Sequence, residues 1–277
     1  MTTDSPHTAP AIRVRDLTKR FGRTEVLDGI DFDIAPNVIC GLFGRNGVGK
    51  TTLMSILTAQ GFATSGEVQI FGEEPYENSR VLPRMCFVRE NQKYPDDARP
   101  QHAFEIARLF YPNWSDELAA QLAEDFRLPM CTRIKKLSRG QLSAVGVIIG
   151  LASRADITFF DEPYLGLDAV ARQIFYDRLL ADYADHPRTI LLSSHLIDEI
   201  ADLIERVLVI DGGKITVDAD ADDLRSRALT VVGNEDAVNR FVADREELHR
   251  ERLGPVASAT VLGELTAADE ARLRELG

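Results

Sequence analysis

The stretch that decides the fold is a glycine-rich loop near the N-terminus: Gly44-Arg45-Asn46-Gly47-Val48-Gly49-Lys50-Thr51. It matches the phosphate-binding pattern G-x-x-x-x-G-K-[ST] in full. The apolar run Val38–Phe43 before it is typical of a buried strand, and Thr52–Leu57 after it is typical of the first turns of a helix. Because the pattern requires this strand–loop–helix setting, an ordinary glycine-rich turn is the weaker interpretation.

The residues of this loop suit a chain of phosphates. The glycines let backbone N–H groups turn inward, and the N-terminus of the following helix adds partial positive charge. Lys50 would lie against the β- and γ-phosphates, and Thr51 would offer its hydroxyl to Mg²⁺. The predicted nucleotide contacts here are Gly44, Arg45, Asn46, Gly47, Val48, Gly49, Lys50, Thr51 and Thr52.

Length and charge narrow the class of protein. The chain has 277 residues, 44% of them hydrophobic and 27% charged, which predicts one large domain or one domain with a lobe and a tail. The formal net charge of -12 argues against nucleic acid as a partner, since that class needs a basic face. We attribute the acidity to solubility.

The remaining composition argues against a metal-thiolate site and a membrane span. Cys40, Cys86 and Cys131 are scattered, so we interpret them as reduced thiols, mostly small core residues. No apolar run approaches the roughly 20 residues of a spanning helix, so a membrane function would need another chain. Residues 1–10 predict a flexible tail and not a signal peptide.

Hydrophobic patterning predicts an α/β fold: a P-loop NTPase core with a mostly parallel sheet, an antiparallel β subdomain, a helical insert and a small C-terminal α/β lobe. Strands and helices alternate over most of residues 11–226, the predicted ATP-binding domain. Helical spacing over about residues 100–138 predicts the insert. From residue 227 to 277 the pattern loosens and suggests a β-α-β lobe ending in strand Ala257–Leu262.

Polar residues follow two of the predicted strands, where ligands gather in such sheets. Asp161 ends the apolar run Ile157–Phe160 and would hold Mg²⁺. Glu162 points in a different direction, so it can face the attacking water as general base. His195 follows the strand Thr189–Ser194 and would reach the γ-phosphate and that water. With Lys50, these residues form the predicted catalytic set for ATP hydrolysis.

The order of these motifs resembles the ATP-binding subunit of an ABC transporter. The resemblance covers roughly residues 11–217 and is closest to stand-alone subunits of bacterial exporters for drugs, peptides or lipids. The motifs that carry it are Phe21, the glycine-rich loop, the helical insert, Leu137-Ser138-Arg139-Gly140-Gln141, Asp161-Glu162-Pro163, Gly166-Leu167-Asp168 and His195.

The resemblance implies a head-to-tail dimer with two ATP molecules at its interface, formed by two copies or with a paralogous subunit. Each ATP would lie between one P-loop and the other subunit's Ser138, Gly140 and Gln141. Asp168 would line the interface, a role compatible with capping a helix. Phe21 would stack on adenine. The implied partner is a membrane-spanning permease on a separate chain, at the inner face of the cell membrane.

Two positions depart from the family pattern. Arg139 replaces the first glycine of the common Leu-Ser-Gly-Gly-Gln signature, a position that does not need a left-handed backbone. The family also places a metal-side glutamine after the strand that ends at Val88, where this chain has Glu90, with Gln92 nearby. Either Glu90 serves on the metal side, which we prefer, or Gln92 serves after a shift of the loop.

A soluble ABC ATPase acting on ribosomes or DNA is the alternative function. It is disfavoured because the chain has no long coiled-coil insertion, carries one such domain and is acidic. A regulator with a dead site is disfavoured by the intact set Lys50, Thr51, Asp161, Glu162 and His195. The transported substrate, the role of the lobe and the choice between self-dimer and heterodimer stay open, and export over import rests on the family resemblance.

Overall fold

The computed structural model describes residues 9–90, 92–195, 200–226, 228–243, 247–253 and 256–262, with residues 269 and 273. Most of the predicted N-terminal tail therefore lies outside the described residues. The chain divides into two compact units, Met1–Asp218 and Ala219–Gly277. The first holds all the motifs on which the predicted nucleotide site depends.

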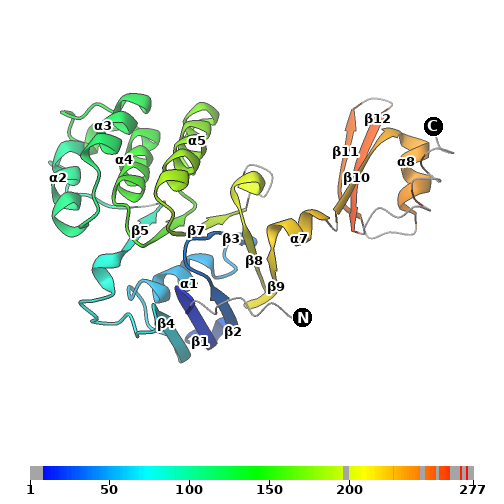
Figure 1. The fold of residues 1–277 in the computed structure, drawn as a ribbon, viewed down its shortest axis with the longest axis horizontal. Coiled ribbons are helices and arrows are strands. Elements are labelled where there is room, and N and C mark those ends of the chain that lie inside the picture. The colour runs from blue at the N-terminus through cyan, green and yellow to red at the C-terminus, as the bar shows by residue number, and fades with distance from the viewer. Residues whose placement is uncertain are drawn as a thin grey trace. The chain divides into compact units, whose positions relative to one another are not determined.

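A six-stranded sheet forms the centre of the first unit, with strand order β5-β6-β7-β3-β8-β9 (Figure 1). The pairs β5–β6, β6–β7, β7–β3 and β3–β8 are all parallel. Their apolar residues are buried on both faces, as expected of a covered parallel sheet. The strands are β3 Ile39–Phe43, β5 Met85–Arg89, β6 Ile157–Asp161, β7 Thr189–Ser194, β8 Arg206–Asp211 and β9 Lys214–Asp220.

The predicted antiparallel subdomain is a three-stranded sheet of order β2-β1-β4. Its strands are β1 Ile12–Phe21, β2 Thr24–Ile34 and β4 Ser65–Ile70. Their inward residues share one hydrophobic cluster with α1 (Lys50–Leu57) and with the parallel sheet. This shared core fixes the strand that precedes the P-loop against the helix that follows it. Asn37, in the turn before β3, has a left-handed backbone with φ of 56°, a conformation that asparagine adopts more readily than most residues.

Helix α4 packs on β5, and α2, α3 and α5 each pack on α4 (Figure 1). Ser115 caps α3 by accepting a hydrogen bond from the Leu118 amide, as its position before two acidic residues predicts. Ala103 and Ala107 of α2 are buried, whereas Ile106 and Phe110 are exposed. The helices are α2 Pro100–Phe110, α3 Asp116–Asp125, α4 Arg139–Ala152 and α5 Ala169–Asp185, with single 3₁₀ turns η1 Leu82–Arg84, η2 Ile134–Lys136 and η3 Ala201–Leu203.

The second unit contains an antiparallel sheet of order β10-β12-β11 with helix α8 packed on it. Its core joins Val238, Phe241 and Val242 of the helix to Ala257, Ala259 and Val261 of β12. The sequence analysis missed β11, because its run of charged residues hides the strand pattern. The elements are α7 Ala221–Ser226, β10 Ala228–Asn234, α8 Glu235–Val242, β11 Glu247–Leu253 and β12 Val256–Leu262.

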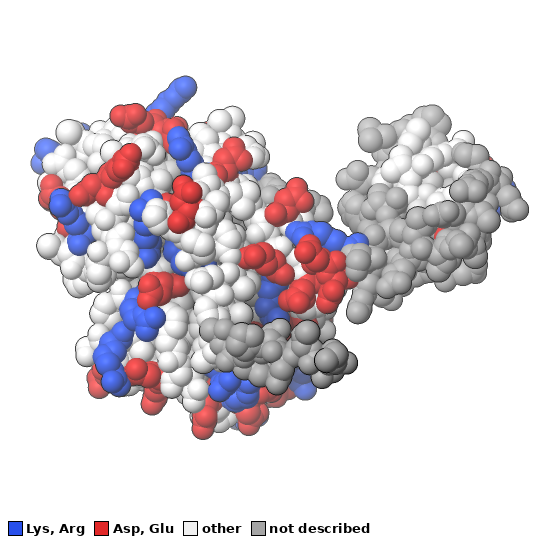
Figure 2. Space-filling view, viewed as in Figure 1, with Lys and Arg blue, Asp and Glu red and all other residues white. Residues whose placement is uncertain are grey.

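The structure bears on two expectations from the sequence: that the surface lacks a basic face and that most cysteines are core residues. Figure 2 shows acidic and basic side chains interspersed over the described part of the face it draws, without a continuous basic area. Burial raises the pKa of the Cys40 and Cys86 thiols, which keeps them protonated. Cys131 is exposed, so two of the three cysteines are core residues, in agreement with the expectation that most of them are.

Candidate functional site

The P-loop connects β3 to α1 and bends in a way that only glycine tolerates well. Gly44, Gly47 and Gly49 have φ of 150°, 82° and 117°. A β-carbon on Gly44 would lie 2.5 Å from the carbonyl oxygen of Ile210, and one on Gly49 would lie 2.9 Å from Leu27 Cδ2. The loop is therefore pressed against β8 and β2, with no room for larger residues at Gly44 and Gly49.

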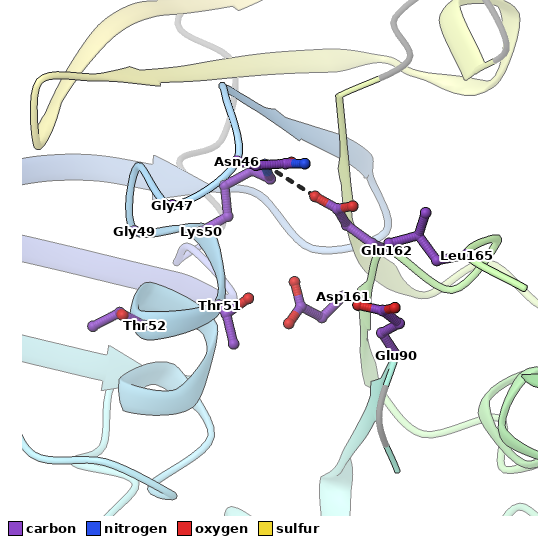
Figure 3. Close-up of a pocket in the computed structure, with 10 residues that line it drawn as sticks. All are labelled: Asn46, Gly47, Gly49, Lys50, Thr51, Thr52, Glu90, Asp161, Glu162 and Leu165. Atoms are coloured by element: carbon purple, nitrogen blue, oxygen red, sulfur yellow. Dashed lines mark ion pairs between the residues drawn. The ribbon is translucent and has the colours of Figure 1, made fainter.

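Lys50 is the buried cation of the site, with 5% of its surface exposed. Its Nζ donates to the carbonyl oxygen of Gly44 at 2.7 Å and lies 3.1 Å from Glu162 Oε1 (Figure 3). A buried ammonium needs such partners. The same group is placed to meet a phosphate that enters beside it.

Two consecutive carboxylates stand at the C-terminal end of β6 and take different directions. Asp161 is buried and accepts a hydrogen bond from Ser193 Oγ at 2.9 Å. Glu162 has φ of 48°, which turns its side chain away from the strand, and its amide donates to the same Ser193 Oγ at 3.0 Å. Figure 3 shows Asp161 facing Thr51 and Glu162 facing Lys50. The divergence expected from the sequence is therefore present.

His195 follows β7 and lies beside Glu162. Its Nδ1 is 3.1 Å from Glu162 Oε2 and 3.2 Å from the hydroxyl oxygen of Tyr164. The Tyr164 hydroxyl is also 3.0 Å from Ser194 Oγ and accepts from the His195 amide at 3.2 Å. Tyr164 is buried and fixes the position of the histidine from two sides. The sequence analysis missed it, because a tyrosine among apolar residues is typical of a core.

Lys50, Asp161 and Glu162 line a pocket of about 270 Å³, whereas His195 is not part of its lining (Figure 3). Its lining joins the P-loop, the residue after β5 and the two carboxylates at the C-terminal end of β6. The lining residues are Asn46, Gly47, Gly49, Lys50, Thr51, Thr52, Glu90, Asp161, Glu162 and Leu165. The pocket contains one buried cation, the backbone of a glycine-rich loop and carboxylates. These groups suit a phosphate chain with a divalent cation.

The donor set fits Mg²⁺ only as a partial site. The Thr51 hydroxyl and the Asp161 carboxylate face one another, and both are oxygen donors of the kind that Mg²⁺ prefers. Among the described residues, no group of three or more His, Cys, Asp or Glu could hold a metal ion. In magnesium sites of this kind, water and substrate phosphates complete the coordination.

Glu90 lines this pocket and also forms an ion pair with the signature segment. Arg139 Nη2 is 2.5 Å from Glu90 Oε1. Glu90 and Gln92 both line an adjoining pocket of about 460 Å³ with Thr51 and Asp161, so both residues considered for the metal side lie close to it. Asn91 between them is outside the described residues.

The signature segment begins helix α4. Ser138 Oγ accepts from the Gln141 amide at 3.2 Å, and Gln141 Oε1 accepts from the Ser138 amide at 3.0 Å, a reciprocal capping box. Arg139 is the first helical residue and needs no left-handed backbone, as expected. A β-carbon on Gly140 would lie 2.8 Å from the Gly166 carbonyl oxygen, which accounts for glycine there.

Three predicted nucleotide contacts of the signature segment do not line the P-loop pocket: Ser138, Gly140 and Gln141. Asp168 also lies outside it and caps α5 by accepting from the Ala171 amide at 2.8 Å.

Phe21 ends β1 with 57% of its surface exposed, and Lys19 Nζ lies 4.7 Å from its ring centre. Lys19 lies over one face of this exposed ring, and an aromatic ring of this kind can stack on a planar ligand.

Comparison with known proteins identifies the family. The family model described as "ABC transporter" matches residues 27–165. An aliphatic sulfonates import ATP-binding protein of Xanthomonas axonopodis is 34% identical over 72% of this chain and 80% of its own length. A doxorubicin resistance ATP-binding protein of Mycobacterium tuberculosis is 30% identical over 79% and 68%. The chain belongs to the ABC transporter ATP-binding family.

Solved structures agree on the fold. The ATP-binding subunit of an ABC transporter superposes with a TM-score of 0.69 at 21% identity, over 78% of this chain and 92% of that one. The protein is thus an ATP-binding subunit of an ABC transporter and an ATPase, in a family whose ATP-binding subunits work with a membrane transporter component. Within the described part of the chain, no helix is long and apolar enough to cross a membrane.

Proposed function

We propose that this chain hydrolyses ATP in a head-to-tail dimer and thereby drives an exporter whose membrane-spanning permease is a separate chain. The observation that carries the proposal is the division of the site. Lys50, Asp161 and Glu162 meet in one pocket, whereas the signature residues Ser138 and Gly140 lie outside it. A second copy or a paralogous subunit would bring its signature segment over this pocket.

Hydrolysis requires a water oxygen to attack the γ-phosphorus while the bond to the β–γ bridging oxygen breaks. In our proposal Glu162 accepts the water proton, since its carboxylate stands at the rim of the pocket between Lys50 and His195. Lys50 stabilises the charge on the phosphates. His195, fixed by Tyr164, keeps the carboxylate and the water in place.

Mg²⁺ would be held by the Thr51 hydroxyl and the Asp161 carboxylate, with Glu90 as a further carboxylate on the metal side. The ion would neutralise charge on the β- and γ-phosphates. Ser193 supports this role because its hydroxyl fixes Asp161. The adenine base would stack on Phe21.

Export is the direction we propose. The relative named for doxorubicin resistance supports it, while the relative named for sulfonate import shows that names alone do not fix the direction. The proposed location is the inner face of the cell membrane, through the permease. Nucleic acid is not a proposed partner, because the chain is acidic.

An affinity capture tests the proposal. Tagged Glu162→Gln protein would be incubated with ATP and gently solubilised native membranes, and its partners would be identified by mass spectrometry. We expect a stoichiometric multi-spanning protein in the ATP sample and less of it with ADP. Recovery of ribosomes or DNA-processing proteins in its place would contradict the membrane role and favour a soluble ABC ATPase.

A further inference from the structure

The ion pair between Glu90 and Arg139 joins two segments of the first unit that are far apart in the sequence. Glu90 follows β5, and Arg139 is the first residue of α4, directly after the capping Ser138. Their side chains are 27% and 70% exposed. Exposed pairs of this kind stabilise a fold little. The position of the pair at the phosphate pocket therefore suggests a role other than stability.

The arginine side chain also packs on a glycine that leaves room for it. Gly166 has φ of 101°, and a β-carbon there would lie 3.0 Å from Arg139 Cγ and 3.5 Å from Arg139 Nε. Ser143 Oγ donates to the neighbouring carbonyl of Leu165 at 2.9 Å and holds this segment against α4. The guanidinium is thus directed to Glu90 from a fixed stem.

Charge in the pocket explains why Glu90 needs a cation. The lining includes three carboxylates, Glu90, Asp161 and Glu162. Glu162 is paired with Lys50 at 3.1 Å, and Asp161 faces the proposed metal position. A triphosphate brings several further negative charges to the same space. An uncompensated Glu90 would repel it, with a strength set by the partly exposed surroundings.

We propose that Arg139 is a positioning residue of the nucleotide site: it acts through Glu90, neutralising this carboxylate and holding it aside so that a triphosphate can bind. The inference rests on the proposed nucleotide site. It adds that Glu90 is paired with Arg139 when the metal is absent. When Mg²⁺ is bound, the metal can take over part of that neutralisation.

The test measures ATP affinity by titration calorimetry, once with EDTA and once with Mg²⁺. In EDTA, Arg139→Ala should weaken ATP binding about three- to tenfold, because one negative charge is left unpaired near the phosphates. In EDTA, where Glu90 can hold no metal, Glu90→Gln should raise affinity, because it removes a negative charge beside the phosphates. The double variant Arg139→Ala/Glu90→Gln should return to within about twofold of wild type, and Arg139→Lys should behave like wild type.

Two further readouts separate charge from structure. The loss in Arg139→Ala should shrink with Mg²⁺ and with added salt, since both screen or neutralise Glu90. Arg108→Ala is the matched control: Arg108 is also an exposed arginine of the helical region, paired with Asp116 at 3.3 Å. It should leave affinity unchanged. Thermal unfolding of each variant checks that the fold is retained.

Several results would overturn the inference. If both single variants weaken ATP binding equally and the double variant binds ATP no more tightly than they do, the ion pair only stabilises the fold. If Arg139→Ala binds ATP as wild type does in EDTA, the charge has no effect. If wild-type protein shows no ATP binding that Lys50→Ala removes, the nucleotide site itself is wrong, an outcome that the Lys50 variant distinguishes from failure of the Arg139 inference alone.

Discussion

Replacing Glu162 with glutamine tests the chemistry most sharply, because it removes one charge and keeps the shape. In the structure this carboxylate contacts Lys50 Nζ at 3.1 Å and His195 Nδ1 at 3.1 Å. The amide of glutamine retains one oxygen that can accept from Lys50. It cannot accept a proton from water.

The expected loss of turnover follows from this. A positioned general base contributes about 100- to 10,000-fold to rate, or roughly 3–5 kcal/mol of barrier. The effect on stability is smaller, about 1–2 kcal/mol, because one charge-assisted hydrogen bond to a buried ammonium becomes a neutral one. The substitution should therefore change the activation barrier of ATP hydrolysis by more than it changes the free energy of unfolding.

The assay is steady-state phosphate release over a range of ATP concentrations, with calorimetric ATP binding and thermal unfolding on the same samples. Glu162→Gln should bind ATP as tightly as wild type and release phosphate at least about 100-fold more slowly. Glu105→Gln, an exposed carboxylate on α2, is the control and should behave like wild type. Turnover above about a tenth of the wild-type rate would refute the assignment of Glu162 as general base.

Three further predictions concern the rest of the site and the thiols. Lys50→Ala should weaken ATP binding about 100-fold or more, because it removes the one buried cation that lines the described pocket; calorimetry showing unchanged affinity would contradict the P-loop role. Tyr164→Phe should lower turnover about 5- to 30-fold with little change in ATP affinity, since it releases His195; an unchanged rate would mean that the histidine needs no such support. Titration with a thiol reagent at pH 8 should detect one fast-reacting cysteine in the native protein and three after unfolding, with Cys131→Ser abolishing the fast phase; rapid reaction of a second thiol would contradict the burial that raises the other two pKa values.

Much of the fold is predictable from local pattern. Short apolar runs such as Ile157–Phe160 become strands that are buried on both faces, and they place Asp161 and Glu162 at a strand end. Glycine spacing in the P-loop predicts the bend, because only glycine adopts such φ values at low cost. Ser138 and Gln141, three residues apart, predict the capped start of α4.

The features that the sequence does not predict depend on contacts between segments that are far apart in the chain. The Arg139–Glu90 ion pair joins residues that are 49 positions apart in the sequence, and no local pattern around either residue predicts the other as its partner. Tyr164 has its role because β7 carries His195 next to it. Strand β11 is held by pairing with β12, so its charged sequence could not predict it. In each case tertiary contact, and not local preference, decides the outcome.

The central claim is that one ATP site requires two copies of this chain or a closely related subunit. Sedimentation velocity of Glu162→Gln protein tests it directly, with saturating ATP, with ADP and without nucleotide. We expect a dimer with ATP that retains two nucleotides, and a monomer in the other two conditions. A protein that binds ATP fully and stays monomeric at all accessible concentrations would contradict a self-formed shared site.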